Sequence, residues 1–271
     1  MTMGTVGTVV RATLVVALLG GACHAGIIVD GLVHESVAGS GEAYTGTVTI
    51  RNAEFEPMRA RLYQKDYLFY SDGSNIYGEP GADERSNASW MTLSANYVEV
   101  PGESSVDVRY TVNVPADESL RGSYWSLLMI EELPAGGADA TSESLSTQRS
   151  SVIQVLRYGV QMVTHIGGTG ETVVAFTDQT LVQGEDGTRT LLIDVENTGE
   201  RSMRPNLWVE LHDSSGSRLG RFESEKRRLY PGTSVRFAVD LTDAPGGSYQ
   251  ALVVVDNGDE HVFGAQYGME F

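Results

Sequence analysis

Two runs decide how the fold is interpreted: GSYWSLLMIEELP, residues 122–134, and RSSVIQVLRYGVQMVTHI, residues 149–166. Both are dense in apolar and β-branched residues, and a polar segment rich in Ala, Gly, Ser and Thr separates them. This composition predicts two β-strands joined by a long loop. We interpret the pair as the last two strands of an immunoglobulin-like sandwich, and the second strand as a candidate open edge.

Short alternating runs bounded by turn residues continue on both sides of this pair. Residues 105–114 alternate as a half-buried strand does, after a Pro101-Gly102 turn and before Pro115. No long stretch repeats apolar residues with the helical period. The predicted fold class is all-β, with two immunoglobulin-like β-sandwich domains in tandem after a signal peptide.

A Gly-Gly-Thr-Gly run at residues 167–170 is the best candidate linker. We predict a signal peptide at residues 1–25, a first immunoglobulin-like domain at residues 26–167, and a second at residues 168–271. Short matches link the two halves: the Pro-Gly turn at Pro231 resembles that at Pro101, and Gly-Ser-Tyr occurs at both Gly122 and Gly247. The halves are therefore interpreted as two copies of one sandwich plan.

The first 25 residues have the pattern of a secretory signal peptide. Arg11 is the only charged residue, residues 12–19 are apolar, and small residues follow. Cleavage after Ala25 would remove Cys23, the only cysteine. Lipid attachment at Cys23 is the alternative, although Gly20 stands where such a site has Leu. We expect an exported protein, periplasmic or at the cell envelope or surface, with no membrane insertion after cleavage.

Charge and motif content limit the possible functions. The 19 Lys and Arg residues against 36 Asp and Glu residues give a net charge of −17, which disfavours nucleic acid and anionic lipid as partners. The five histidines are dispersed, and no nucleophile elbow, phosphate loop or dinucleotide fingerprint occurs. Adjacent Glu131 and Glu132 would point to opposite faces of a strand. We expect no catalytic residue, metal or cofactor.

The second run offers a binding mechanism instead. Leu156, Tyr158, Val160 and Met162 alternate on one face, and an unpaired strand of this kind can complete the sheet of another protein. The alternative is that these side chains face the core of their own domain, as one face of every sandwich strand does. The sequence leaves both interpretations open.

Residues 90–166 also resemble a known family. A Pro-Gly turn, an alternating strand, Pro115, Gly-Ser-Tyr-Trp, Ile-Glu-Glu-Leu-Pro, a variable loop and a long strand follow one another, as in the first domain of periplasmic pilus-assembly (fimbrial) chaperones. The resemblance implies two immunoglobulin-like domains set at an angle. It also implies a strand that lends alternating apolar residues to an unfinished pilin subunit.

The sequence departs from this family in its charges. The family holds the terminal carboxylate of the subunit with an Arg near its first strand and a Lys in the donor strand. Here no Arg or Lys occurs between Gly26 and Ile50, and Arg157 is the only basic residue within the last strand, hence a possible anchor. We expect a non-enzymatic binding protein, chaperone-like for secreted or pilin-like β-rich protein subunits. The alternative is an envelope or cell-surface immunoglobulin-like module with a structural or adhesive role.

Overall fold

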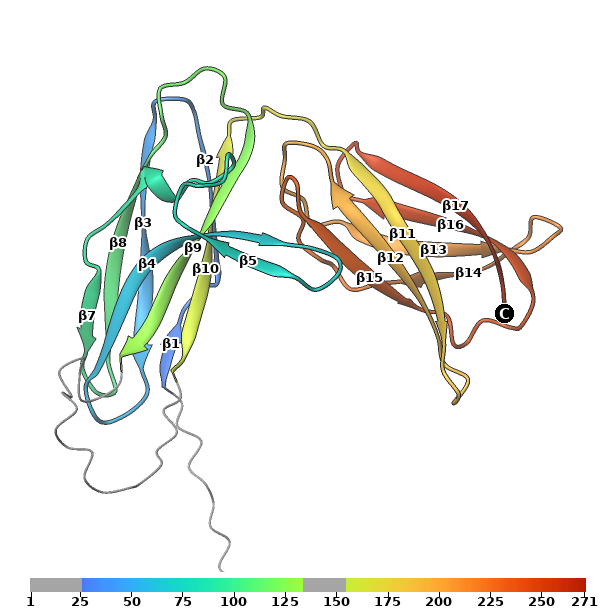
Figure 1. The fold of residues 1–271 in the computed structure, drawn as a ribbon, viewed down its shortest axis with the longest axis horizontal. Coiled ribbons are helices and arrows are strands. Elements are labelled where there is room, and N and C mark those ends of the chain that lie inside the picture. Colours follow the sequence, from blue (N-terminus) through green and yellow to red (C-terminus); the bar gives the residue numbers. More distant parts are fainter. Residues whose placement is uncertain (1–25, 134–154) are drawn as a thin grey trace, which may run out of the picture.

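The computed structural model of the chain describes residues 26–133 and 155–271 (Figure 1). The predicted signal peptide and most of the polar insert lie outside the described residues. The strands of the first half are β1 (Ile27–Val29), β2 (Val33–Ala38), β3 (Ala43–Asn52), β4 (Met58–Phe69), β5 (Asn75–Gly78), β6 (Met91–Leu93), β7 (Tyr97–Val100), β8 (Ser105–Asn113), β9 (Gly122–Leu133) and β10 (Arg157–Ile166). One turn of 3-10 helix, η1 (Ala88–Trp90), precedes β6.

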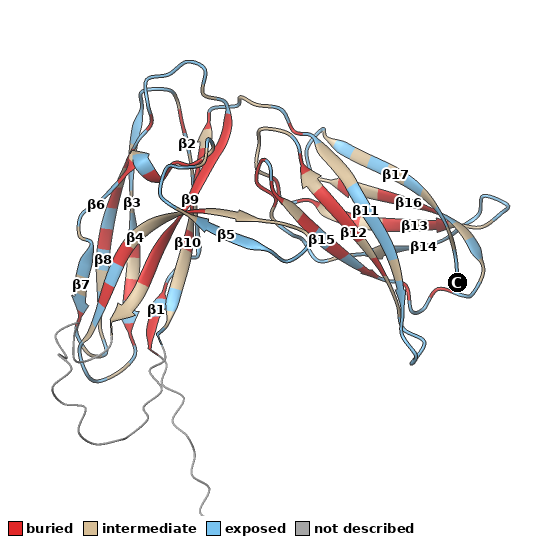
Figure 2. Cartoon of the chain, viewed as in Figure 1, coloured by how far each residue is buried: buried red, intermediate tan, exposed pale blue. Residues whose placement is uncertain are grey.

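The first half is a sandwich of two sheets. One sheet has the strand order β1-β3-β8-β6, and the other has the order β2-β10-β9-β4-β5, with β7 paired to the first part of β4. Alternate residues of both sheets meet in one core, to which β3 and β8 contribute Val48 and Val108 and β9 contributes Leu128 and Ile130. Figure 2 shows β9 buried along most of its length, which is why its sequence is almost continuously apolar.

The second half repeats this plan. Its strands are β11 (Val174–Gln183), β12 (Arg189–Asn197), β13 (Asn206–His212), β14 (Arg218–Glu223), β15 (Ser234–Asp240), β16 (Ser248–Asp256) and β17 (Val262–Glu270). They form sheets of order β11-β12-β15 and β14-β13-β16-β17 around a core of their own. The predicted all-β fold of two tandem immunoglobulin-like sandwiches is confirmed. The predicted domain limits stay a prediction, and no strand bridges the two halves in the described sheets.

The chain changes sheet between β1 and β2. β1 pairs antiparallel with β3 in one sheet, whereas β2 pairs parallel with β10 in the other. Gly31 lies at the crossing with a φ of 72°, a left-handed conformation that glycine adopts without a side-chain penalty. Because β2 begins only at Val33, it reaches no farther along β10 than Gln161.

The connection after β5 is fixed by a buried carboxylate. Asp66 accepts hydrogen bonds from the backbone N–H groups of Gly81 (2.9 Å) and Asp83 (2.8 Å), and a third from the Ser86 hydroxyl. A buried carboxylate needs such donors, because burial without them is costly. The connection is therefore held against β4.

Within the described residues, we find no helix that is long and apolar enough to cross a membrane.

Candidate functional site

The last strand of the first sandwich is only half paired on one side. β10 pairs with β9 along its whole length, from Arg157 opposite Glu131 to Ile166 opposite Gly122. β2 pairs only with Gln161 and the residues that follow it. On that side, no strand among residues 26–133 and 155–271 pairs with residues 157–160, which we call the open half of β10.

The register shows which backbone groups face the open side. The Leu156 carbonyl accepts a hydrogen bond from Glu132 N–H (3.1 Å), so even-numbered residues of β10 bond to β9. The backbone N–H and C=O groups of odd-numbered residues point away from β9, as the hydrogen bond from Gln161 N–H to the Leu32 carbonyl (2.8 Å) shows. Arg157 and Gly159 therefore direct their N–H and C=O groups toward the open side, where a further strand could bond to them.

The predicted partner-binding side chains lie partly in the chain's own core. Val160 and Met162 are 0% and 2% exposed, and they pack with residues of both sheets. Tyr158 packs against the same core, and Leu156 is half-buried just before β10 begins. In this structure the side chains of Val160, Met162 and Tyr158 therefore pack in the core of their own domain. Insertion of these side chains into a partner stays a prediction, whereas the absence of a second neighbouring strand at residues 157–160 is a feature of the part of the chain that the structure describes.

The possible anchor, Arg157, is engaged with a carboxylate of the neighbouring strand. Its Nε lies 3.1 Å from Glu131 Oε2, while its own side chain is 57% exposed. The hydroxyl of Tyr63 donates to the same carboxylate oxygen (2.9 Å). Burial raises the pKa of Glu131, but the hydrogen bonds from Tyr63 and Arg157 outweigh burial and hold that pKa below its usual value. Arg157 is thus placed at the open half, in an exposed ion pair that costs little to exchange for another.

The outer face of the same sheet carries a groove beside the open half. Its volume is about 560 Å³, and it runs across β5, β4, β9 and β10. The lining residues are Tyr63, Lys65, Tyr67, Tyr77, Leu127, Met129, Arg157, Gly159 and Gln161. The groove and the open backbone edge share Arg157 and Gly159, so they form one continuous site.

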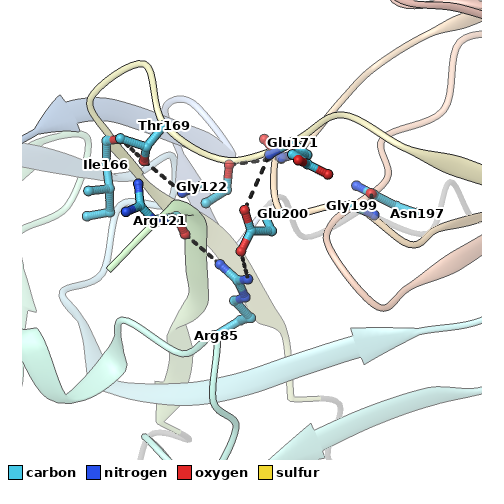
Figure 3. Close-up of polar contacts among 11 residues, drawn as sticks. Arg85, Arg121, Gly122, Ile166, Thr169, Glu171, Asn197, Gly199 and Glu200 are labelled. Carbon is cyan, nitrogen blue, oxygen red and sulfur yellow. Dashed lines mark hydrogen bonds and ion pairs between the residues drawn. The ribbon is translucent and has the colours of Figure 1, made fainter. Parts of the chain in front are cut away.

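The second sandwich meets the first at a close backbone contact near the start of β9 (Figure 3). Ser123 N–H donates to the Glu200 carbonyl (2.8 Å). The Arg85 guanidinium donates to the Glu200 carboxylate (3.3 Å) and to the Arg121 carbonyl (2.5 Å), as Figure 3 shows. Gly122 has a φ of 73°, and a Cβ there would lie 2.0 Å from the Glu200 carbonyl oxygen. Only glycine fits this approach.

Aromatic residues fill the rest of the junction. The Tyr230 ring of the second sandwich stacks on Trp125 of β9, with ring centroids 4.7 Å apart and planes 8° apart. Trp125 Nε1 donates to the Tyr67 carbonyl (2.7 Å), and the Tyr230 hydroxyl donates to Gln161 Oε1 (2.6 Å). Burial raises the pKa of Tyr230 far above its usual value, so the hydroxyl stays protonated. The junction therefore anchors the paired half of β10 to the second sandwich.

A serine, a histidine and a glutamate also come together at this junction. The Ser123 hydroxyl lies 2.9 Å from His165 Nδ1, and His165 Nε2 lies 3.8 Å from Glu35 Oε2. The order is that of a catalytic triad. However, Ser123 is 0% exposed and its oxygen already accepts a hydrogen bond from Ser202 N–H (2.8 Å). The serine is closed to a substrate, and the cluster joins the two sandwiches.

Sequence reasoning missed the groove and the junction. Their residues come from strands far apart in the chain, such as Tyr63, Met129 and Gly159, and no spacing rule connects them. The available signal was Gly159, because a glycine inside a strand often marks a close approach of another backbone or ligand.

Comparisons with known proteins give matches by structure alone. No protein-family model matches the chain, and no curated protein sequence matches it. The chain is similar to the class 5 fimbriae chaperone CfaA, at 12% identity and a TM-score of 0.49, covering 89% of this chain and 98% of that one. It is also similar to a chain of a chaperone–tip adhesin complex of CFA/I fimbriae biogenesis, at 11% identity and a TM-score of 0.48, covering 90% and 98%.

A third similar structure is a chain of the CsuC–CsuE chaperone–tip adhesion subunit complex of Acinetobacter baumannii. The identity is 14% and the TM-score 0.44, covering 89% of this chain and 98% of that one. These structures come from fimbrial chaperone systems, the family that the sequence resembles. At these identities and TM-scores the likeness concerns the fold, so the proposals below use this chain's own residues.

Proposed function

We propose that the chain is an exported binding protein that pairs an extended segment of a β-rich protein subunit with the open half of β10. This is a chaperone-like role, because an edge of this kind completes the sheet of a client protein. The observation that carries the proposal is the pair of outward-facing peptide groups at Arg157 and Gly159.

The proposal is supported by the tendency of an unpaired strand edge to associate with another chain. Unpaired strand edges are sites of association with other chains, and folded proteins commonly cover or blunt them. In an added strand, main-chain hydrogen bonds supply affinity and side-chain pockets supply selectivity. The open half offers two N–H donors and two C=O acceptors, at Arg157 and Gly159, beside a groove that can receive side chains.

A backbone substitution tests the proposal. Gly159→Pro removes an N–H that points to the open side, and proline is tolerated in strands where the N–H has no ladder partner. Gly264→Pro in β17 is the matched control. The Phe271 N–H bonds to the Gly247 carbonyl (3.1 Å), so odd-numbered residues of β17 bond to β16 and Gly264 also points its N–H away from the sheet.

The measurement is capture of exported proteins of the source organism by the tagged mature chain and its variants. We expect a β-rich protein to be captured by wild type and by Gly264→Pro, and to be reduced at least about tenfold for Gly159→Pro, since a lost hydrogen bond and a displaced strand both weaken pairing. Arg157→Pro is a second variant of the same kind. Val160→Asp is unsuitable, because Val160 is fully buried.

Two outcomes would count against the proposal. Equal capture by wild type, Gly159→Pro and Arg157→Pro, all folded by circular dichroism, would place the binding surface elsewhere and favour an envelope or surface module. Capture lost equally for Gly264→Pro would show that the effect is not specific to β10.

A further inference from the structure

The groove on the outer face is lined at one position by a glycine, Gly159, which has no side chain to fill it. Gly159 lies on β10 between Arg157 and Gln161, which point to the same face, and it contributes no side chain. A Cβ at this position would lie 3.2 Å from Leu127 Cδ1 and 3.5 Å from Met129 Sδ. Leu127 and Met129, which are 5% and 9% exposed, form the floor of the groove here, and the glycine adds no side chain above them. Among the described residues, no strand pairs with β10 on the far side of Gly159.

The walls of the groove are aromatic. Tyr67 of β4 and Tyr77 of β5 stack with ring centroids 5.3 Å apart, and Tyr63 lies farther along β4. The volume of about 560 Å³ falls in the range of pockets that bind small ligands and large side chains, roughly 300–1,000 Å³. Aromatic rings and a thioether pack favourably with another aromatic ring.

A strand added to the open half would bring a side chain to this glycine. Directly opposed residues of neighbouring strands have Cβ atoms about 4.5–5.5 Å apart, and long side chains also reach their diagonal neighbours. The residue opposite Gly159 would point to the same face as Gly159, over the groove. An aromatic side chain across from a strand glycine covers the exposed surface that the glycine leaves, which is a known way to stabilise glycine in sheets.

The charges at the groove favour the same kind of occupant. The charged residues of the lining are Lys65 and Arg157, and each is paired with a carboxylate: Lys65 Nζ lies 2.7 Å from Glu79 Oε1, and Arg157 Nε lies 3.1 Å from Glu131 Oε2. Arg61 already lies over the Tyr63 ring, 5.0 Å from its centroid. A guanidinium or ammonium group attracts the face of an aromatic ring even when it is paired with a carboxylate, so Lys65 and Arg157 complement an aromatic side chain.

We propose that the groove receives an aromatic side chain from the partner residue that lies opposite Gly159 when a partner strand pairs with the open half of β10. The inference rests on the proposed function and adds a selectivity rule to it. The partner segment is an extended strand with an aromatic residue at one position.

The probe is a set of fluorescent nine-residue peptides with alternating Thr and Val and one central guest residue: Phe, Leu, Ala or Lys. An extended peptide can shift its register by two residues, so a favourable guest side chain can find its place opposite Gly159. Fluorescence anisotropy with the mature wild-type chain measures the dissociation constants. We expect the Phe peptide to bind about 10 to 100 times more tightly than the Ala peptide, with Leu between them and Lys weakest.

Variants locate the effect at the groove. Gly159→Leu keeps the backbone donor and fills this position from within; its Cβ meets the flexible end of Leu127, so the chain can adjust. We expect this variant to bind the Phe and Ala peptides equally. Gly264→Leu is the matched control on β17, where a Cβ would lie 3.5 Å from the Val253 carbonyl oxygen, an ordinary contact, and it should keep the wild-type preference.

A position-specific readout completes the test. A peptide with benzoylphenylalanine as guest, irradiated on the wild-type chain, should cross-link to Met129 or Leu127. A cross-link mapped to the second sandwich would overturn the proposal, as would equal affinity for free N-acetylphenylalanine amide, which needs no strand. A wild-type dimer that Gly159→Leu dissociates would also overturn it, because a second copy would then be the occupant.

The failure of this inference differs from failure of the proposed function. If the peptides bind and Gly159→Pro abolishes binding, but Phe and Ala guests bind equally, the edge is functional and the aromatic rule is wrong. If all peptides bind equally to wild type and to Gly159→Pro, the edge itself is not the binding site, and both proposals fall.

Discussion

Two strands of the molecule, β10 and β17, each carry a glycine whose N–H points to an unpaired side, and they differ in what lies beside that glycine. Within residues 26–133 and 155–271, β17 has no partner strand on this side along all nine residues, whereas β10 lacks one only over residues 157–160. By length alone, β17 is the larger edge. Yet Gly264 borders the Val253 backbone, while Gly159 borders Leu127 and Met129 in an aromatic groove.

The difference shows that an open edge is not by itself a binding site. On the outer face of β17, Gly264, Gln266, Gly268 and Glu270 are exposed and offer little apolar surface to a neighbouring strand (Figure 2). Hydrogen bonds gained by strand pairing replace bonds to water, so their net contribution is small, about 0.5–1.5 kcal/mol each. Selectivity has to come from side chains, and the groove beside β10 supplies their contacts.

The largest expected contrast is in amide hydrogen exchange. In the free chain, the Gly159 and Gly264 amides should exchange roughly 10³ times faster or more than that of Val160, which bonds to β9 and is released by local or global opening. On addition of the Phe peptide, only the β10 amides should slow. Exchange measured by NMR decides this. A slow Gly159 amide in the free chain would show that another segment already covers the edge.

Two methionine truncations measure how firmly the strands are built into their cores. Met162 of β10 is 2% exposed, whereas Met269 of β17 only packs against the edge of the second core. Met162→Ala should lower the free energy of unfolding by about 2–5 kcal/mol, and Met269→Ala by less than half of that. Urea unfolding of both variants provides the measurement. Equal losses would mean that β17 is as deeply anchored as β10.

Much of the fold could be predicted from sequence because strands carry local signals. The alternation of residues 105–114 and the apolar run after Gly122 correspond to β8 and β9. The alternation of Tyr158, Val160 and Met162 was equally visible, but alternation shows that one face is buried and not what buries it. Here the chain's own core does so.

The site itself could not be predicted in the same way. The open half of β10 depends on where β2 begins, and that follows from the sheet change at Gly31, which leaves no periodic pattern. The groove depends on pairing across four strands, so its residues become neighbours only through the register. The contact of Gly122 with Glu200 at the junction likewise joins residues far apart in the chain. Its only signal in the sequence was a glycine at the start of a strand.

A pair of tyrosine substitutions tests whether the paired half of β10 needs the second sandwich. Tyr230→Phe removes a hydroxyl that donates to Gln161 at 2.6 Å and should cost about 1–2 kcal/mol, because Gln161 loses its buried partner. Tyr249→Phe, beside β17, removes a hydrogen bond to the Pro245 carbonyl at an exposed site and should change stability by less than about 0.5 kcal/mol. Thermal unfolding compares them. Similar effects would show that the junction hydroxyl adds nothing to β10.

The smallest expected effect is a dependence on pH at the same junction. Burial lowers the pKa of His165, and Arg201 and Arg228 lower it further, while Glu35 opposes them. The unfolded chain, with an ordinary histidine pKa of about 6.5, therefore binds more protons than the folded chain in the window below that pH. Stability should decline as the pH falls from 7 toward 5, and His165→Asn should make this decline shallower.

The readout that separates β10 from β17 is local. Protonation makes both ring nitrogens of His165 hydrogen-bond donors and places a positive charge in a largely buried site, so acid should first weaken the contact between β10 and the start of β9. The amides of Gln161 and Val163 should then exchange faster at pH 5 in wild type than in His165→Asn, with Ala265 of β17 unchanged in both. Equal acid sensitivity of Val163 and Ala265 would mean that acid loosens both sandwiches together and that His165 has no special part in holding β10.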